Sequence, residues 1–340
     1  MKALVKLKPE KGLWLQEIDI PTIKDHEVLI KVQATALCGT DLHIYDWNAW
    51  AQKTIATPLI IGHEFMGEIA AIGSAVTHLK IGERVSGEGH ITCGICRNCR
   101  EEKRHLCPHT QSIGSQKNGA FAEYLSLPAS NIIQIPDYIS NDTAAILDPL
   151  GNAFHTAHSF DLIGEDILIT GAGPIGLMAI AIAKQVGARH IVVTDINDYR
   201  LDLAKRLGAT YAINIQQESL SKTIQTLDLT DGFTVGLEMS GQPEALLLLL
   251  DTVSHGASIG LLGIPEHNFA IDWNKVIFKG LTLKGIFGRK MYETWDKVIH
   301  LLQSGLTLSP IITHHFKAED YEAAFKAAAA GLAGKIILQW

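Results

Sequence analysis

The segment Asp166-Ile167-Leu168-Ile169-Thr170-Gly171-Ala172-Gly173-Pro174-Ile175-Gly176 decides the fold. Its first five residues form a largely apolar run that is typical of a buried parallel strand, and an alanine-rich helix is predicted from Ile175 to about Val186. Small residues at the turn between them let the backbone approach a pyrophosphate, and the first N–H groups of the helix point at it. The pattern therefore predicts a dinucleotide-binding turn, whose contacts are Gly171, Gly173, Ile175 and Gly176.

The residues after the turn supply the context that a glycine motif needs. Residues 191–195 predict the next strand, which ends in Asp195, about 20 residues beyond the turn. An acid at this position accepts hydrogen bonds from the ribose hydroxyls and repels a 2′-phosphate, which favours NAD over NADP. Arg200 follows on the next predicted helix and offers the alternative of holding a phosphate. A glycine-rich connection without a ligand is the other alternative.

Strand–helix alternation continues to about residue 295. Further strands are predicted over 211–215, 235–240, 257–264 and 281–288, with helices over 198–207 and 244–253. Six strands with intervening helices form one doubly wound parallel sheet, an α/β fold, in which the carboxyl ends of the strands face the cofactor. Gly263, Ile264, Ile286 and Phe287 are therefore candidates to contact the nicotinamide half, with ordinary strand core as the alternative.

The length of the chain favours two domains. At 340 residues it exceeds what one core usually organises. Residues 1–149 read as β-rich, with strands expected near 28–32 and 65–70, and residues 296–340 are expected to fold back onto them. The nucleotide-binding domain is expected to span 150–295.

Four of the five cysteines lie within one short segment. Cys93, Cys96, Cys99 and Cys107 follow a C-x2-C-x2-C-x7-C spacing, which can close a tetrahedral shell around Zn²⁺. A closed shell leaves no position open for substrate, so the site is predicted to be structural. An iron–sulfur cluster and four reduced thiols without metal are the alternatives.

A second metal site is argued from the residues that remain. Cys38 lies in one glycine-containing turn, and His63 and Glu64 lie in another. A catalytic zinc takes three protein ligands and keeps an open position, and with four cysteines already used a carboxylate must complete the shell. One of the acids Glu64 and Asp148 is expected to bind the metal and the other to orient a ligand or relay a proton. The sequence leaves both assignments open, and each residue alone also fits an ordinary core or capping role.

The charge balance excludes some partners. The net charge of −7 offers no basic surface for nucleic acid or anionic membranes. The apolar stretch 167–183 is interrupted by Thr-Gly-Ala-Gly-Pro, which disfavours a transmembrane helix, and no signal segment is recognised. A cytoplasmic location is therefore expected.

With these motifs, the chain resembles the zinc-containing medium-chain alcohol dehydrogenase family over essentially its whole length. Four segments look like those of the bacterial members that oxidise L-threonine, namely 86–94, 148–157, 288–295 and 309–314. The resemblance implies a GroES-like β-rich catalytic domain beside the Rossmann domain, in a homotetramer. It also implies NAD⁺-dependent oxidation of the L-threonine side-chain alcohol to L-2-amino-3-oxobutanoate, the first step of degradation to glycine.

The resemblance also implies roles for individual residues. Cys38, His63 and Glu64 would bind a catalytic zinc, with Thr40 and His43 as a proton relay and Asp148 taking part in proton transfer. The four remaining cysteines would bind the second zinc of each subunit. The implied NAD contacts are Ile175, Asp195, Arg200, Leu262, Gly263, Ile264, Ile286 and Phe287.

The residues that bind the substrate's carboxylate and ammonium are not located by the sequence. His90 and the loop from Trp47 to Trp50 are candidates, with ordinary packing as the alternative. Two competing functions remain: an NAD-linked zinc dehydrogenase of a polyol such as sorbitol or butanediol, and a non-catalytic zinc protein that retains the fold as a structural or dinucleotide-sensing module.

Overall fold

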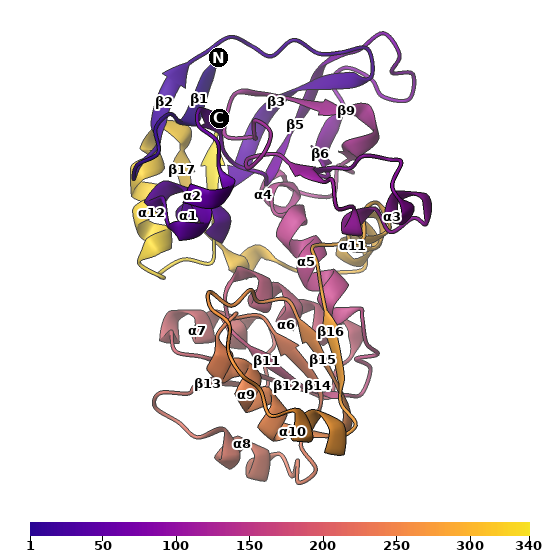
Figure 1. Cartoon of the computed structure of the whole chain (residues 1–340), viewed down its shortest axis with the longest axis vertical. Coiled ribbons are helices and arrows are strands. Elements are labelled where there is room, and N and C mark those ends of the chain that lie inside the picture. The colour runs from indigo at the N-terminus through magenta and orange to yellow at the C-terminus, as the bar shows by residue number, and fades with distance from the viewer. The chain divides into compact units, whose positions relative to one another are not determined.

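A computed structural model describes all 340 residues, and its contacts divide the chain into two compact units (Figure 1). Unit 1 comprises Met1–Asp148, Lys290–Asp296 and Ile312–Trp340, and unit 2 comprises Pro149–Arg289 and Lys297–Ile311. The segment Lys297–Ile311, expected from the sequence to belong to the β-rich domain, therefore lies in unit 2 instead. The physical reason is local packing, because the 3₁₀ turn η3 (Ser309–Ile311) contacts helices α6 and α7 of that unit.

Unit 2 contains the six-stranded parallel sheet that the sequence predicts. The strand order is β13-β12-β11-β14-β15-β16, and every pair is parallel. The strands are β11 (Asp166–Thr170), β12 (His190–Asp195), β13 (Tyr211–Asn214), β14 (Phe233–Glu238), β15 (Val253–Leu261) and β16 (Thr282–Gly285). The chain starts at β11, steps outward to β13 and returns to β14 on the other side. The order therefore reverses beside β11, which is where doubly wound sheets bind dinucleotides.

The helices of unit 2 follow from clear start and stop signals. Helix α6 begins with Pro174 in its first turn and ends at Gly187, whose φ of 94° suits a left-handed helix end. Its residues from Gly176 to Ala183 are all buried. Helix α6 spans Pro174–Val186, and the other helices within the unit are α7 (Asp198–Arg206), α8 (Leu220–Thr226), α9 (Pro243–Thr252) and α10 (Trp273–Phe278). Helices α5 (Leu147–Ala157) and α11 (Glu293–Gln303) begin in unit 1 and end in unit 2.

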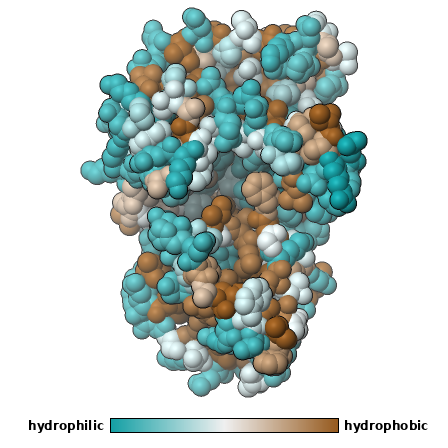
Figure 2. Space-filling view, in the orientation of Figure 1, coloured by the Kyte–Doolittle hydropathy of each residue, from teal (hydrophilic) through white to brown (hydrophobic).

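The short helices α8 and α10 are not predicted by the sequence, because each is too short for a helical repeat of apolar residues to be recognised. Helix α10 leaves Trp273, Ile277 and Phe278 exposed at 61%, 67% and 77% of their surface. Figure 2 shows brown patches on this part of unit 2. Strand β16 beside it is the edge of the sheet and is itself largely exposed.

Unit 1 is built on three sheets. The largest has the order β10-β6-β5-β3-β18-β17, with β9 also paired to β3. Its strands are β3 (Glu27–Ala36), β5 (Phe65–Ile72), β6 (Arg84–Gly87), β9 (Tyr124–Pro128), β10 (Ile132–Gln134), β17 (Ile312–Lys317) and β18 (Lys335–Gln339). The smaller sheets are formed by β1 (Lys2–Lys6), β2 (Trp14–Glu17) and β4 (Leu59–Ile60), and by β7 (His90–Ile91) with β8 (Gln111–Ser112).

The last strand of the chain positions the site. β18 runs antiparallel to β3, and Leu37 N–H donates to the Ile336 carbonyl at 3.0 Å. Ala36 N–H donates to the Glu64 carbonyl at 3.1 Å, so the loops after β3 and before β5 are fixed to one another.

The helical elements of unit 1 are α1 (Gly39–Asp46), α2 (Ala49–Thr54), α3 (Arg97–Arg100), α4 (Asn141–Ala145), α12 (Tyr321–Ala329), η1 (Arg104–Leu106), η2 (Ala129–Asn131) and η4 (Ala318–Asp320). Across both units, no helix has the length and apolar character needed to cross a membrane.

Candidate active site and metal centres

Three potential metal ligands converge in unit 1. Cys38 immediately precedes α1, and His63 and Glu64 immediately precede β5. Their ligand atoms all lie within 4.8 Å of one another. Glu64 is buried and the His63 side chain is 19% exposed, so the site is nearly dry with one accessible side. A thiolate, an imidazole and a carboxylate fit a zinc ion that keeps a fourth position open.

A glycine shapes the turn that carries His63. Gly62 has a φ of 88°, and a Cβ there would lie 2.1 Å from the ring of Phe121. A side chain would therefore collide with the core and also strain the backbone. This packing fixes the direction in which the chain presents His63 and Glu64.

Asp41 is a member of the site that the sequence does not reveal. It is buried, its Oδ2 accepts from the Cys38 N–H at 2.9 Å, and its Oδ1 lies 4.0 Å from His63 Nδ1. Burial raises the pKa of Asp41, and its Oδ1 has no hydrogen-bond partner. Asp41 therefore adds negative charge beside His63 without a hydrogen bond to its ring. The only signal in the sequence is an acid three residues after Cys38.

Lys335 is the second residue that the sequence does not reveal. Its Nζ donates to Glu64 Oε1 at 2.6 Å and also contacts Oε2, and it donates to the Leu37 carbonyl at 2.8 Å. Both side chains are at most 2% exposed. Burial raises the pKa of Glu64 to about 7 against the opposing effect of the Lys335 charge. A single lysine at the start of an otherwise apolar strand was the available signal.

The groups around His63 favour positive charge at this place, either as a proton on the ring or as a bound cation. Burial disfavours the imidazolium, but the electrostatic effect and hydrogen bond of Cys38 and the charges of Asp41 and Asp148 together raise the pKa of His63 well above 6.5. Asp148 is itself buried and lies at the start of α5. Its charge acts on both His63 and Glu64, so Asp148 lies near these two ligands.

The proposed relay residues lie on α1. Thr40 Oγ1 is 3.8 Å from Cys38 Sγ, and His43 follows one helical turn later on the same face. His43 is exposed, and its Nδ1 accepts from Asn48 Nδ2 at 2.8 Å. This bond leaves the proton of a neutral ring on Nε2.

The loop after α1 has a packing role. The Lys6 ammonium lies 4.9 Å from the centre of the Trp47 ring and donates to the carbonyls of Gly12 and Tyr45. Trp50 meets the His43 ring edge-on at 6.2 Å. This half of the loop therefore supports His43.

The four-cysteine lobe is brought together as the spacing predicts. The Sγ atoms of Cys93, Cys96, Cys99 and Cys107 all lie within 4.8 Å of one another. Cys107 Sγ is 3.6 Å from that of Cys93 and 3.9 Å from that of Cys96. Although burial opposes it, hydrogen bonds to its sulfur lower the pKa of Cys107 to about 6, so this thiol favours the metal-binding thiolate. Four converging sulfurs fit one closed tetrahedral zinc shell.

The glycine turn of unit 2 has the geometry of a phosphate cradle. A Cβ on Gly176 would lie 2.0 Å from the Gly171 carbonyl oxygen, and one on Gly171 would meet Ser240 at 2.9 Å. A Cβ on Gly173 would meet nothing within 4 Å, so the space in front of α6 is open. Asp195 Oδ2 accepts from the Ala172 N–H at 2.6 Å, which places the acid beside the turn. These features fit a bound dinucleotide.

The remaining cofactor candidates differ in exposure. Ile264 is 88% exposed and Phe287 58% exposed, so ordinary strand core does not describe them, whereas Ile286 is buried. β15 ends at Leu261, and Leu262 and Gly263 donate to the Glu238 carbonyl at 3.0 and 3.1 Å. Arg200 is half-buried, with its Nε unpartnered, on the first turn of α7.

Glu238, which the sequence does not reveal, orders the loops around this edge of the sheet. Its buried carboxylate accepts from the N–H groups of Ser240 and Gly241 at 2.8 and 3.0 Å. A Cβ on Gly263 would lie 2.3 Å from Glu238 Oε2. The Glu238 carboxylate thus holds the loop after β14, and its backbone carbonyl holds the loop after β15.

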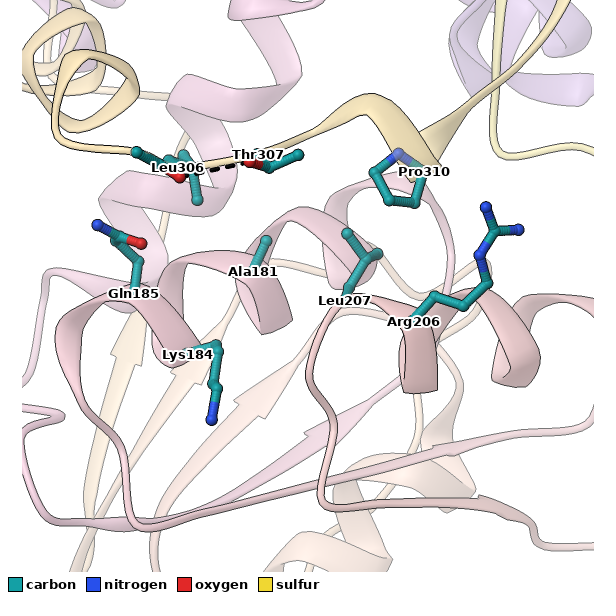
Figure 3. Close-up of a pocket in the computed structure, with 9 residues that line it drawn as sticks. Ala181, Lys184, Gln185, Arg206, Leu207, Leu306, Thr307 and Pro310 are labelled. Carbon is teal, nitrogen blue, oxygen red and sulfur yellow. Dashed lines mark hydrogen bonds between the residues drawn. The ribbon is translucent and has the colours of Figure 1, made fainter.

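A separate hollow of about 180 Å³ lies at the other end of α6 and α7 (Figure 3). It is lined by the last turns of these helices and by residues 305–310. Because α6 starts at the carboxyl end of β11, its last turn lies toward the amino-terminal ends of the strands. This hollow is therefore distinct from the glycine turn.

Comparison with known proteins identifies a matching family model for a segment of each unit. Residues 24–137 match the family model "Alcohol dehydrogenase GroES-like domain", and residues 174–304 match "Zinc-binding dehydrogenase". A solved short chain alcohol dehydrogenase from Escherichia coli, complexed with NADH, has a TM-score of 0.92 at 29% identity. The match covers 100% of this chain and 99% of the E. coli chain.

Sequence relatives are more similar still. A curated L-threonine 3-dehydrogenase of Vibrio parahaemolyticus is 58% identical over 340 residues, which is 100% of this chain and 99% of the relative. One from a Shewanella species is also 58% identical, with full coverage of both chains. The chain therefore belongs to the zinc-containing medium-chain alcohol dehydrogenase family.

Proposed function

We propose that this protein is an NAD⁺-dependent L-threonine 3-dehydrogenase, which oxidises the secondary alcohol of L-threonine to L-2-amino-3-oxobutanoate. The observation that carries the proposal is the 58% identity, over the full length, with curated enzymes of that activity. The convergence of Cys38, His63 and Glu64 supports it, because a non-catalytic descendant needs no open metal site. In this role the enzyme begins the degradation of threonine to glycine.

The residues present fit the two groups that this reaction needs. Zinc bound by Cys38, His63 and a carboxylate supplies a Lewis acid that lowers the pKa of the substrate alcohol, and NAD⁺ supplies the hydride acceptor. Glu64 lies within reach of the other two ligands and also accepts from Lys335, so Lys335 and zinc would share its carboxylate. Asp148, whose charge reaches the same ligands, is the alternative acid.

The chain's own groups then handle the proton. The Thr40 hydroxyl lies beside Cys38 and can accept the proton that the alcohol loses. His43, one turn along α1 and exposed, can pass it to water. Asn48 donates to Nδ1, so a neutral His43 ring carries its proton on Nε2. The ring can release that proton to water, and it accepts the relayed proton at Nδ1 once the bond to Asn48 opens.

The finer features of the proposal concern cofactor, metal content and assembly. Asp195 beside the turn supports NAD over NADP, and the two ligand clusters support two zinc ions per subunit. The exposed apolar side chains of α10 beside the edge strand β16 support a homotetramer. Five free cysteines support the reducing cytoplasm as its location.

A substrate panel tests the activity. The purified protein is given NAD⁺ with L-threonine, 2,3-butanediol or sorbitol, and NADH formation is followed by its absorbance. We expect the highest kcat/KM with L-threonine. A higher value with either diol would identify a polyol dehydrogenase instead, and cofactor binding without turnover on any alcohol would indicate a non-catalytic protein. A metal count of two zinc ions per chain tests the metal content.

A further inference from the structure

Glu238 is a buried carboxylate at the carboxyl end of the parallel sheet, and the proposed proton relay does not use it. It is the last residue of β14, and only 4% of its surface is exposed. Its Oε1 accepts from the backbone N–H groups of Ser240 and Gly241 and from the hydroxyls of Ser240 and Thr170. A buried carboxylate is costly unless its oxygens have partners of this kind.

The hydrogen-bond partners of Glu238 do not compensate its negative charge. Backbone N–H groups can only donate. The Ser240 hydroxyl accepts from the Gln242 N–H at 3.0 Å and donates its own proton to Glu238. A set of donors suits the ionised form of the acid, which can only accept. All of these donors are neutral, so they satisfy the oxygens without supplying a counter-charge.

Two other buried acids of the chain differ from Glu238 in this respect. Asp166, at the amino end of β11, pairs with Arg189, and Glu64 pairs with Lys335. A buried charge that lacks such a partner lowers stability. The presence of one at the carboxyl ends of the strands therefore points to a cationic group of a ligand.

The place of Glu238 in the sheet indicates which part of a dinucleotide would meet this charge. β14 lies on one side of β11, and β12 lies on the other. Asp195 at the end of β12 is on the side of the adenosine ribose, so a dinucleotide that crosses the sheet at β11 has its nicotinamide half on the side of β14. The nicotinamide ring is a cation when oxidised and neutral when reduced. Glu238 is thus on the side where the charge of the cofactor changes.

The loop after β15 packs directly on the carboxylate. A Cβ on Gly263 would lie 2.3 Å from Glu238 Oε2, and one on Gly241 would lie 2.6 Å from the Ile264 carbonyl oxygen. Gly263 and Ile264 are candidates to contact the nicotinamide half, and no side chain of Gly263 separates that surface from Glu238. Because little protein and no bulk water lie between, the charge is weakly screened.

We infer that Glu238 supplies the counter-charge for the oxidised nicotinamide ring, so that NAD⁺ binds more tightly, relative to NADH, than it would without this carboxylate. The inference rests on the proposed NAD⁺-dependent function and assigns to this residue a preference between the two redox states of the cofactor. In an oxidation this preference retains the reactant form of the cofactor and favours release of the reduced product.

Binding of both nucleotides to the zinc-loaded protein tests the inference. Isothermal titration calorimetry, without L-threonine, gives the dissociation constants of NAD⁺ and NADH. In Glu238→Gln the ratio of the Kd for NAD⁺ to the Kd for NADH should rise about 3- to 10-fold, the scale of one unit charge acting on another at a partly buried site. Glu238→Ala removes the same charge and should raise the ratio in the same way, so it serves if Glu238→Gln does not fold. Disorder of the loops alone would weaken both nucleotides by the same factor, and an unchanged ratio in a folded variant would overturn the inference.

Two controls separate the charge of Glu238 from its effect on the loops. Glu238→Asp keeps the charge on a shorter side chain, so both nucleotides should bind more weakly while the ratio stays within about twofold of wild type. Glu244→Gln removes an exposed acid in the first turn of α9, where water screens the charge, and should leave both constants unchanged. A ratio that rises as much in either control as in Glu238→Gln would also contradict the inference. A wild type that binds both nucleotides but does not oxidise L-threonine would reject the proposed substrate and leave the test of Glu238 intact.

Discussion

At the scale of single residues, the site depends on ion pairs between positions far apart in the sequence. Glu64 and Lys335 are separated by 271 positions, yet both are buried and their charged groups touch. The pair satisfies two charges that could not be buried alone. It also holds Glu64 at the edge of the ligand cluster, so Lys335 competes with a metal for the same oxygens.

Replacing Lys335 by Met should destabilise the metal-free protein by about 3 kcal/mol or more, because it leaves a buried carboxylate without its counter-charge. Bound zinc should reduce this loss, since the metal supplies positive charge to Glu64. Chemical denaturation of metal-free and zinc-loaded protein measures both. The double variant Lys335→Met with Glu64→Gln is the matched control and should recover most of the stability. An equal loss in the single and double variants would show that Lys335 contributes through packing alone.

Replacing His43 by Ala should slow turnover and shift its pH profile while the metal content of the protein stays unchanged. His43 is exposed and touches no metal ligand in this structure, so we expect a loss of about 10-fold, below the ~100-fold of a group that meets the reacting proton directly. Added imidazole should restore part of the rate. Steady-state kinetics across pH, with a metal count on the same sample, provide the measurement. Unchanged pH-dependent kinetics would remove His43 from the relay.

At the scale of elements, the turn from β11 into α6 divides its glycines between folding and binding. Gly176 faces the Gly171 carbonyl at a distance that admits no side chain, whereas Gly173 faces open space. Gly173 also has a φ of −64°, which any residue adopts. Packing of the fold therefore requires glycine at position 176, whereas only a bound ligand would require glycine at position 173.

This division predicts opposite results for two substitutions of the same size. Gly176→Ala should lower the stability of unit 2 by about 1–3 kcal/mol, because the backbone must shift to admit the methyl group. Gly173→Ala should leave the thermal unfolding temperature unchanged and weaken NADH binding, measured by the fluorescence of the bound nucleotide. Wild-type affinity in Gly173→Ala would mean that the dinucleotide does not lie over this turn.

The start of the central strand carries a pH-dependent contribution to stability. Burial acts to raise the pKa of Asp166, but hydrogen bonds from Arg189 and His190 outweigh burial and lower this pKa below 3.8. An acid whose pKa is lower in the folded than in the unfolded state stabilises the fold at any pH above its unfolded-state pKa. This contribution is lost as the pH falls through the folded-state pKa. Asp166→Asn should therefore cost about 1 kcal/mol or less at pH 7, since Arg189 is largely exposed. In acid denaturation the stability difference from wild type should shrink as the pH falls through the folded-state pKa of Asp166, and a constant difference would contradict this origin.

At the scale of the whole molecule, the features that the sequence predicts are those encoded in short local patterns. The strand 166–170, its glycine turn and the acid at 195 are read from neighbouring residues, and the six-stranded sheet built on them is confirmed. The four-cysteine lobe is also local, and its sulfurs do converge. Asp41 and Lys335 could not be predicted, because each acquires its role from a partner brought in by tertiary packing, His63 for Asp41 and Glu64 for Lys335. For the same reason the segment Lys297–Ile311 was placed in the wrong unit.

The last prediction concerns assembly. Trp273, Ile277 and Phe278 are exposed on α10, beside an edge strand whose backbone groups lack a neighbour on one side. Such surfaces are typical of contacts between subunits. Analytical ultracentrifugation should therefore give a mass four times the 37.0 kDa of the chain. Ile277→Asp should lower this mass, because a charge at a buried contact is costly. Ile163→Asp, at a similarly exposed position of unit 2, is the control and should leave the mass unchanged. A wild type that sediments as a single chain would show that this apolar surface is not an interface between copies.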